Sequence, residues 1–220
     1  MLAGLLAGLF AYSIGEPFVD QAIRLEEASA GSHGGEIFSR ATQKVGLFFA
    51  TGLFGVTVGG IFGMAFAYFR TRLTSETDWM RSLSLAAAIF AGAFLIPFIK
   101  YPANPPTVGD PATIGERTAS YFAMVSLSLL AVLTAWQVAK ILRERKVVAP
   151  ARHLSIGLGL VLAVAALCVG LPAGPDPGGF PAGLLWSFRL SSLATQLVFW
   201  TGLGAIFGLL CERANRRELL

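Results

Sequence analysis

Six long apolar runs follow one another along the chain, each separated from the next by a more polar segment. None of them alternates between apolar and polar positions, as the strands of a membrane barrel do over about ten residues. A bilayer core holds no water, so a backbone that crosses it must form its hydrogen bonds within its own segment. The pattern therefore predicts an all-α, polytopic membrane protein that forms a single transmembrane helical domain, residues 1–220. We expect spans at about residues 1–15, 44–69, 83–99, 119–142, 154–171 and 190–210.

The first run is the shortest of the six. A helix over Met1–Ile14 would be about 21 Å long, whereas a bilayer core is about 30 Å thick. Either the helix starts upstream, or it is extended by the residues around Glu16-Pro17, since proline is tolerated in a first helical turn. A cleaved signal peptide rests only on the weak site Ala11-Tyr12-Ser13 and lacks a basic leading region.

Glycines spaced four residues apart lie within several runs. Such spacing places small residues on one face of a helix and lets a second helix approach closely. The pairs or series are Gly4 and Gly8, then Gly55, Gly59 and Gly63, then Gly204 and Gly208. They predict close helix packing within the chain, and a homo-oligomer could form through the same faces.

Composition agrees with a membrane protein. Hydrophobic residues make up 55% of the chain and charged residues 14%, whereas soluble domains carry about 25% charged residues. The net charge is +4, but the basic residues are better explained by membrane topology than by nucleic-acid binding. Cys168 and Cys211 both lie in apolar runs, so we interpret them as buried small residues rather than a disulfide or a metal site.

The distribution of charge predicts an orientation. The segments after spans two and four, together with the C-terminal tail, hold 11 of the 17 Lys and Arg residues. By the positive-inside rule, these segments and both termini face the cytoplasm. Eight of the 13 acidic residues lie on the other side, where an acidic outer mouth would concentrate cations.

The Pro-rich stretch Lys100–Thr118 reads KYPANPPTVGDPATIGERT and joins spans three and four on the predicted outer side. Its four prolines lack backbone donors and restrict the residues before them, which predicts a stiff, structured loop. The loop is either a turn between two helices or the lining of a site between them. The following helix starts either with a capping box, Thr113 to Glu116, or with the pair Asp110-Pro111.

Polar residues on the predicted outer side are the candidates for cation contact. Glu16 and Asp20 are four residues apart and share a helix face, so they can clamp a divalent ion or simply belong to a solvated amphipathic helix. Carboxylate, imidazole and amide oxygen suit first-row divalent metals. The candidate metal contacts are Glu16, Asp20, His33, Asn104, Asp110 and Glu116. No span holds Asp or Glu deep in its core, and no nucleophile–base pair or nucleotide-binding loop is present, which argues against an enzyme.

Several motifs resemble those of the CbtA family of bacterial membrane proteins, which are predicted cobalt transporter components. They are Gly4-Leu-Leu-Ala-Gly8 with Gly15-Glu-Pro17 and Asp20, then Phe38-Ser-Arg40 with Gly46-Leu-Phe48, and above all the stretch Lys100–Thr118. The resemblance implies a component of cobalt uptake in the bacterial cytoplasmic (inner) membrane that supplies cobalamin synthesis. It also implies a small, one-span, His-bearing partner, with Co²⁺ as the transported ion and no permanently bound cofactor. The alternative is a non-transporting membrane scaffold or assembly component.

Overall fold

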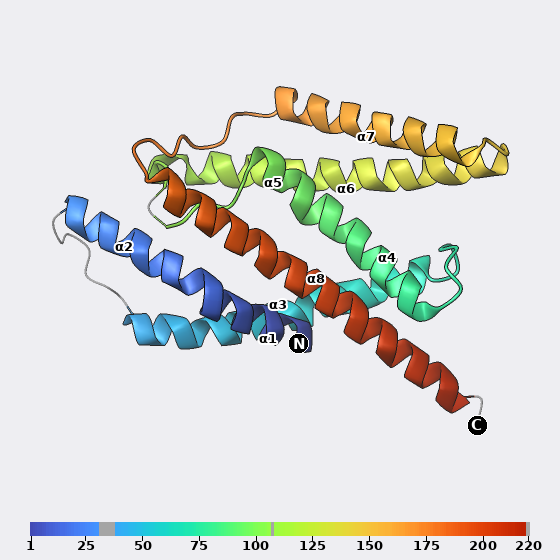
Figure 1. The fold of residues 1–220 in the computed structure, drawn as a ribbon, viewed down its shortest axis with the longest axis horizontal. Coiled ribbons are helices and arrows are strands. Elements are labelled where there is room, and N and C mark those ends of the chain that lie inside the picture. Colours follow the sequence, from blue (N-terminus) through green and yellow to red (C-terminus); the bar gives the residue numbers. More distant parts are fainter. Residues whose placement is uncertain (31–37, 107, 219–220) are drawn as a thin grey trace. The chain divides into compact units, whose positions relative to one another are not determined.

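The computed structural model describes residues 1–30, 38–106 and 108–218 (Figure 1). Every regular element in these residues is a helix, and six helical segments are long and apolar enough to cross a membrane. The all-α prediction with six spans is therefore confirmed. The candidate spans are Leu2–Ala28, Arg40–Phe69, Asp78–Lys100, Pro111–Glu144, Ala149–Gly170 and Ala182–Arg217.

The first helix does continue past Glu16-Pro17. It consists of α1 (Leu2–Phe10), a π-helical turn (Ala11–Gly15) and α2 (Glu16–Ala30). The third span is built in the same way from α4 (Asp78–Phe90), a π-helical turn (Ala91–Leu95) and α5 (Ile96–Lys100). The remaining helices are α3 (Arg40–Phe69), a 3₁₀ turn (Pro111–Thr113), α6 (Ile114–Glu144), α7 (Ala149–Gly170) and α8 (Ala182–Glu218).

The two π-helical turns share their sequence surroundings. Each turn begins at the alanine of a Phe-Ala pair. One residue separates the end of each turn from a Pro-Phe pair, which is Pro17-Phe18 in the first span and Pro97-Phe98 in the third. A proline removes the backbone donor that would bond to the preceding turn. A widened turn directly before the proline lets the helix continue without a break.

The chain divides into two compact units. The first comprises Met1–Ala87, Ala103–Thr107 and Gly179–Leu220, and the second comprises Ala88–Pro102 and Val108–Gly178.

In the first unit, α1 packs against both α3 and α8 (Figure 1). Glycines allow the close approach of α1 and α3. A Cβ atom on Gly4 would lie 2.1 Å from the carbonyl oxygen of Thr51, and one on Gly8 would lie 2.3 Å from its Oγ1. The predicted packing role of this glycine pair is confirmed, because a larger residue at Gly4 would meet the backbone of α3 and one at Gly8 would meet the Thr51 side chain.

The glycine series of α3 packs less evenly than its spacing predicts. A Cβ on Gly55 would lie 2.9 Å from the Cα of Gly4, so this position has to be glycine. By contrast, a Cβ on Gly59 would have its nearest neighbour at 3.9 Å, on Leu203. The expectation that Gly59 lies at a tight helix contact is wrong, because the closest crossing with α1 lies one turn earlier.

Helix α8 also contacts the start of α4. Cβ atoms on Gly204 and Gly208 would lie 2.9 Å from Ala86 Cβ and from Trp79 Cα, respectively. The buried hydroxyl of Ser82 donates a hydrogen bond of 2.7 Å to the carbonyl of Gly204. The predicted Gly204/Gly208 pair is thus a helix contact.

In the second unit, α6 packs against α7 and against the π-helical turn Ala91–Leu95. A Cβ on Gly92 would lie 2.9 Å from Leu129 Cδ2. The buried hydroxyl of Ser128 donates to the Gly92 carbonyl, in a turn where the regular hydrogen-bond ladder is disturbed. A polar side chain from the neighbouring helix therefore supports the irregular turn.

Candidate functional site

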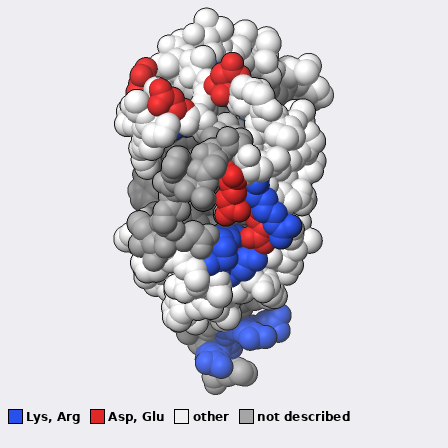
Figure 2. All heavy atoms as spheres, turned by 90° about the vertical axis from the view of Figure 1, so that its left-hand side faces the viewer, with Lys and Arg blue, Asp and Glu red and all other residues white. Residues whose placement is uncertain are grey.

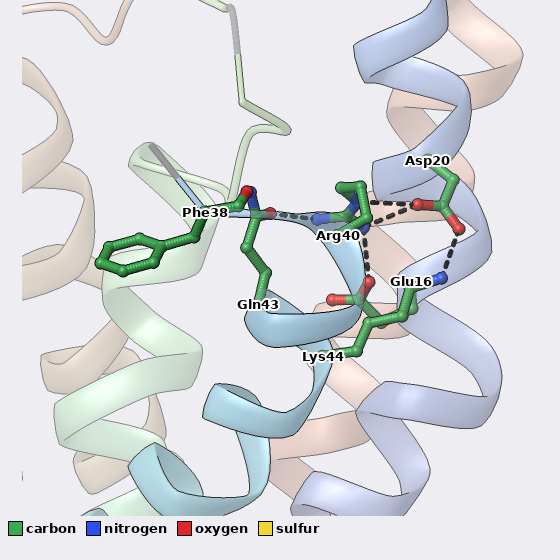
Figure 3. A network of polar contacts seen from close by, with 6 residues as sticks. All are labelled: Glu16, Asp20, Phe38, Arg40, Gln43 and Lys44. Atoms are coloured by element: carbon green, nitrogen blue, oxygen red, sulfur yellow. Dashed lines mark hydrogen bonds and ion pairs between the residues drawn. The ribbon is translucent and has the colours of Figure 1, made fainter. Parts of the chain in front are cut away.

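Four charged side chains meet at the predicted outer end of the first unit (Figure 3). Arg40 is the first residue of α3, whose start is capped by Ser39: the side-chain oxygen accepts a hydrogen bond from the Thr42 N–H. The Arg40 guanidinium points at α2, where its Nη2 lies 2.6 Å from Glu16 Oε2 and 2.6 Å from Asp20 Oδ1. One guanidinium therefore holds both carboxylates.

A second cation completes this network. Lys44 lies one turn after Arg40 on α3, and its Nζ lies 2.8 Å from the other oxygen of Asp20. The side chains of Glu16 and Asp20 are only 15% and 29% exposed. Both carboxylates therefore face α3 and are paired there, and are only partly exposed to solvent.

Electrostatically, the network balances two carboxylates against two cations. The space-filling view from the left-hand side of Figure 1 shows acidic and basic side chains touching within one patch (Figure 2). A divalent cation that bound Glu16 and Asp20 would have to take the place of Arg40. Among the residues that the structure describes, no group of three or more His, Cys, Asp and Glu side chains is placed to hold a metal ion.

The first half of the Pro-rich stretch fastens the C-terminal end of α7. Lys100 Nζ donates to the carbonyl of Cys168 at 2.6 Å, and the Tyr101 hydroxyl donates to the carbonyl of Pro172 at 2.6 Å. A cation at this end compensates the negative end of the helix dipole. Burial raises the pKa of the Tyr101 phenol. These two residues have a structural task.

The second half of the stretch starts α6. The Asp110 carboxylate accepts a hydrogen bond of 2.8 Å from the Ala112 N–H, and Pro111 opens the 3₁₀ turn that leads into the helix. Of the two predicted helix starts, the Asp110-Pro111 pair is the one present. The capping box is wrong, because the Thr113 hydroxyl donates to the Asp110 carbonyl instead and Glu116 is exposed.

Arg117 closes this loop from within the second unit. Its guanidinium donates to the carbonyls of Val108 and Asp110 at 3.4 and 3.2 Å. Gly109 lies between them at φ +96°, and a Cβ there would lie 2.5 Å from Arg117 Nη1. Glycine is required at this position because of both its positive φ and the adjacent guanidinium.

The six predicted contact residues thus occupy different surroundings. Glu16 and Asp20 are brought together on α2, while Asn104 accepts a 2.8 Å hydrogen bond from Arg189 within the first unit. Asp110 and Glu116 belong to the second unit. His33 lies outside the described residues.

A buried ionic cluster at the opposite end of α3 is absent from the sequence-based candidates. Asp78 is 4% exposed and accepts from Arg70 at 3.0 Å, Arg81 at 2.9 Å and Asn215 at 2.8 Å. The sequence places Asp78 in a polar hairpin with the two arginines. It could not supply Asn215, which lies 137 positions away on α8. The cluster joins α3, α4 and α8 and therefore has a structural task.

Six apolar helices with charged clusters at the ends of α3 define a multi-pass membrane protein. A family model described as "Probable cobalt transporter subunit (CbtA)" matches residues 1–212 of the chain. The protein belongs to this family, and membership suggests a transporter component rather than an enzyme. No curated protein and no solved structure matches the chain.

Proposed function

We propose that this protein is a membrane component of cobalt uptake in the bacterial cytoplasmic membrane and that the imported metal supplies cobalamin synthesis. The observation that carries the proposal is the family match over residues 1–212 of a chain with six candidate spans. The transported species is Co²⁺, which passes without a permanently bound cofactor. A small, one-span, His-bearing membrane protein is the proposed partner.

Glu16 and Asp20 are the proposed first contacts of the ion. Their carboxylates lie within one helical turn of each other, and Co²⁺ accepts carboxylate oxygen together with imidazole and water. In the absence of metal, Arg40 and Lys44 neutralise the pair and keep both side chains oriented. His33, Asn104, Asp110 and Glu116 are the further proposed contacts on the outer side.

Two carboxylates are too few ligands for a stable metal site, so the ion needs further ones along its path. Within the described residues no third His, Cys, Asp or Glu joins them. Histidines of the partner would supply nitrogen ligands at this point. This requirement is the physical reason for proposing that the chain does not transport the metal alone.

A scaffold or assembly component is the second candidate function. It is favoured by the same ion pairs, since a neutralised network can serve solely to fasten α2 to α3. The close glycine contacts of α1 and α8 also point to a rigid helix assembly.

Cobalt accumulation separates the two functions. The chain is expressed with and without a candidate partner in cells that lack their own cobalt uptake, and intracellular cobalt is measured by mass spectrometry. For the double variant Glu16→Gln/Asp20→Asn we expect accumulation to fall about tenfold, equivalent to about 1.4 kcal/mol, at unchanged protein level. The amides still accept from Arg40 but no longer carry charge. Glu27→Gln, on the exposed part of α2, is the matched control and should leave uptake unchanged. Normal uptake by the double variant would favour the scaffold.

A further inference from the structure

The turn between α6 and α7 concentrates positive charge in the second unit. Five basic residues and one acidic residue, Glu144, lie between the last two turns of α6 and the first turn of α7. The basic residues are Lys140, Arg143, Arg145, Lys146 and Arg152. Glu144 lies 4.0 Å from Lys140 and neutralises one of them weakly, because both side chains are more than half exposed. A strongly basic surface remains at this end of the helix pair.

Lys146 is held in a backbone conformation that favours glycine. It has φ +58°, and it directly follows Arg145, the last capping residue of α6. The Val147 N–H reaches back to the Leu142 carbonyl at 3.0 Å, and the Lys146 N–H to Arg143 at 2.9 Å. This pattern is the Schellman motif, whose left-handed position usually holds glycine. The charge of Lys146 is thus kept where an uncharged glycine would fit the backbone better. The positive-inside rule, which sets the orientation of the chain in the membrane, would not by itself require a basic residue at this position.

An apolar groove runs along the same helix pair. It has a volume of about 360 Å³, at the lower end of the usual range for ligand sites, and lies between α6 and α7. Its lining includes Leu130, Ala131, Val138, Gly159, Ala163 and Leu167. The two hydroxyls in the lining, from Thr134 and Ser155, each donate 2.8 Å hydrogen bonds to a carbonyl of their own helix. The surface of the groove is therefore apolar, and the hydroxyl groups of Thr134 and Ser155 already have hydrogen-bond acceptors.

The groove leads toward the basic turn. Val138 and Ser155 are the lining residues nearest to it in sequence. Seven residues make nearly two helical turns, so Arg145 continues the face of Val138, and Arg152 lies one turn before Ser155 on the face that lines the groove. Along Ala149–Gly170, all of which the structure describes, no residue is buried. Hydrocarbon at mid-helix and guanidinium groups at the helix end therefore follow one another on one open surface.

We propose that this surface binds an anionic phospholipid, with an acyl chain in the α6–α7 groove and the phosphate at Arg145, Lys146 and Arg152. The bilayer supplies such a ligand wherever an unburied helix pair faces it. Guanidinium and ammonium groups select an anionic headgroup over a zwitterionic one by about 1 kcal/mol each, roughly a fivefold preference per residue. A transmembrane helix of a second copy fits this surface less well, because its apolar side chains would leave the basic end without counter-charge.

Lipid binding by the purified full-length protein tests the proposal. Native mass spectrometry in detergent would compare the occupancy of phosphatidylglycerol and phosphatidylcholine. We expect a clear preference for phosphatidylglycerol, which falls about fivefold in Lys146→Gly and about 25-fold in Arg145→Gln/Arg152→Gln. Lys146→Gly is the informative variant, because it relaxes the backbone and should raise thermal stability while it weakens binding. Arg217→Gln, a basic residue at the end of α8, is the matched control and should change nothing.

The groove requires its own variant. A Cβ on Gly159 would have no atom within 4 Å, so Gly159→Leu fills the groove without a backbone clash. We expect it to lower the bound phosphatidylglycerol while the protein stays folded, as judged by its elution from a size-exclusion column. Equal binding of both lipids, or full binding by Lys146→Gly, would overturn the proposed headgroup site. Unchanged lipid binding by Gly159→Leu would overturn the acyl-chain site. The site would also be overturned if the unsubstituted protein were a dimer and Gly159→Leu dissociated it, because a second copy would then occupy the groove. None of these measurements depends on cobalt transport.

Discussion

Arg40 connects two helices through a single guanidinium. Its planar fork places Nη2 between Glu16 and Asp20, while its Nε lies 3.0 Å from Asp20. An ammonium could not reproduce this geometry, because lysine offers a single point charge. The three side chains are 15–29% exposed, so water screens their interaction only in part.

Removing Arg40 should destabilise the fold more than removing Lys44. Arg40→Ala leaves two adjacent carboxylates with one cation, and we expect it to lower the free energy of unfolding by about 1–2 kcal/mol. Lys44→Ala leaves the guanidinium in place and should cost less than about 1 kcal/mol. Chemical unfolding in detergent would measure both, and equal losses would contradict the central position of Arg40. The loss in the free energy of unfolding for Arg40→Lys should lie between the losses for Arg40→Ala and Lys44→Ala.

Local spacing predicted only part of these residue contacts. That Glu16 and Asp20 share a helix face follows from their four-residue separation. That Arg40 faces them does not follow, because more than twenty residues and a change of chain direction separate it from Glu16. The same holds for Asp78, whose partner Asn215 comes from the last helix. Contacts between distant segments depend on how helices cross, and a single sequence does not encode that in any local pattern.

Glycine contacts decide where the helices of the first unit cross. Gly4 and Gly55 face each other at the closest approach of α1 and α3, while Gly59 and Gly63 face side chains of α8 at ordinary distances. The four-residue spacing correctly predicted that these glycines share one face of α3. The sequence alone does not distinguish a glycine at a tight contact from one at an ordinary distance. Which glycine is indispensable depends on the crossing point.

Substitutions along α3 should reveal this difference. We expect Gly55→Ala to cost about 1–3 kcal/mol, because its methyl group would meet the backbone of Gly4. Gly59→Ala should be neutral or slightly stabilising, since alanine favours the helix and the space is free. Gly60→Ala, with nothing within 4 Å, is the control. Thermal unfolding followed by fluorescence would rank the three, and a loss at Gly59 as large as at Gly55 would contradict the structure.

The molecule as a whole has charged clusters at both ends of α3, a 30-residue helix. Arg40 and Lys44 lie at one end with two acids, and Arg70 lies at the other with Asp78. Six apolar runs were enough to predict the helices and their number. Most of the expected spans were too short, above all the first, where the helix continues through Pro17 by means of a π-helical turn, and the last, which runs over Ala182–Arg217.

Orientation remains a prediction from charge. With Cys168 and Cys211 replaced by alanine, a cysteine at Ala112 should react with a membrane-impermeant thiol reagent added to intact cells. A cysteine at Arg145, in the basic turn between α6 and α7, should react only after the membrane is opened. The reverse pattern would place both termini outside and would remove the acidic outer mouth from the proposed ion path.

The π-helical turn of the first span has a consequence for how the chain tolerates changes in length. A widened turn holds one residue more than an α-helical turn, so it behaves as an insertion that the helix has absorbed. Deleting the exposed Ser13 should return the turn to α-helical geometry, with a kink at Pro17, and leave Gly4 and Glu16 on their present faces. Deleting the exposed Val56 from α3 would instead rotate the rest of that helix by about 100°, moving Phe62 and Phe66 away from Phe207. We expect folded, monodisperse protein on size-exclusion chromatography only from the first deletion. Aggregation of both variants would show that the extra residue is needed for the fold itself.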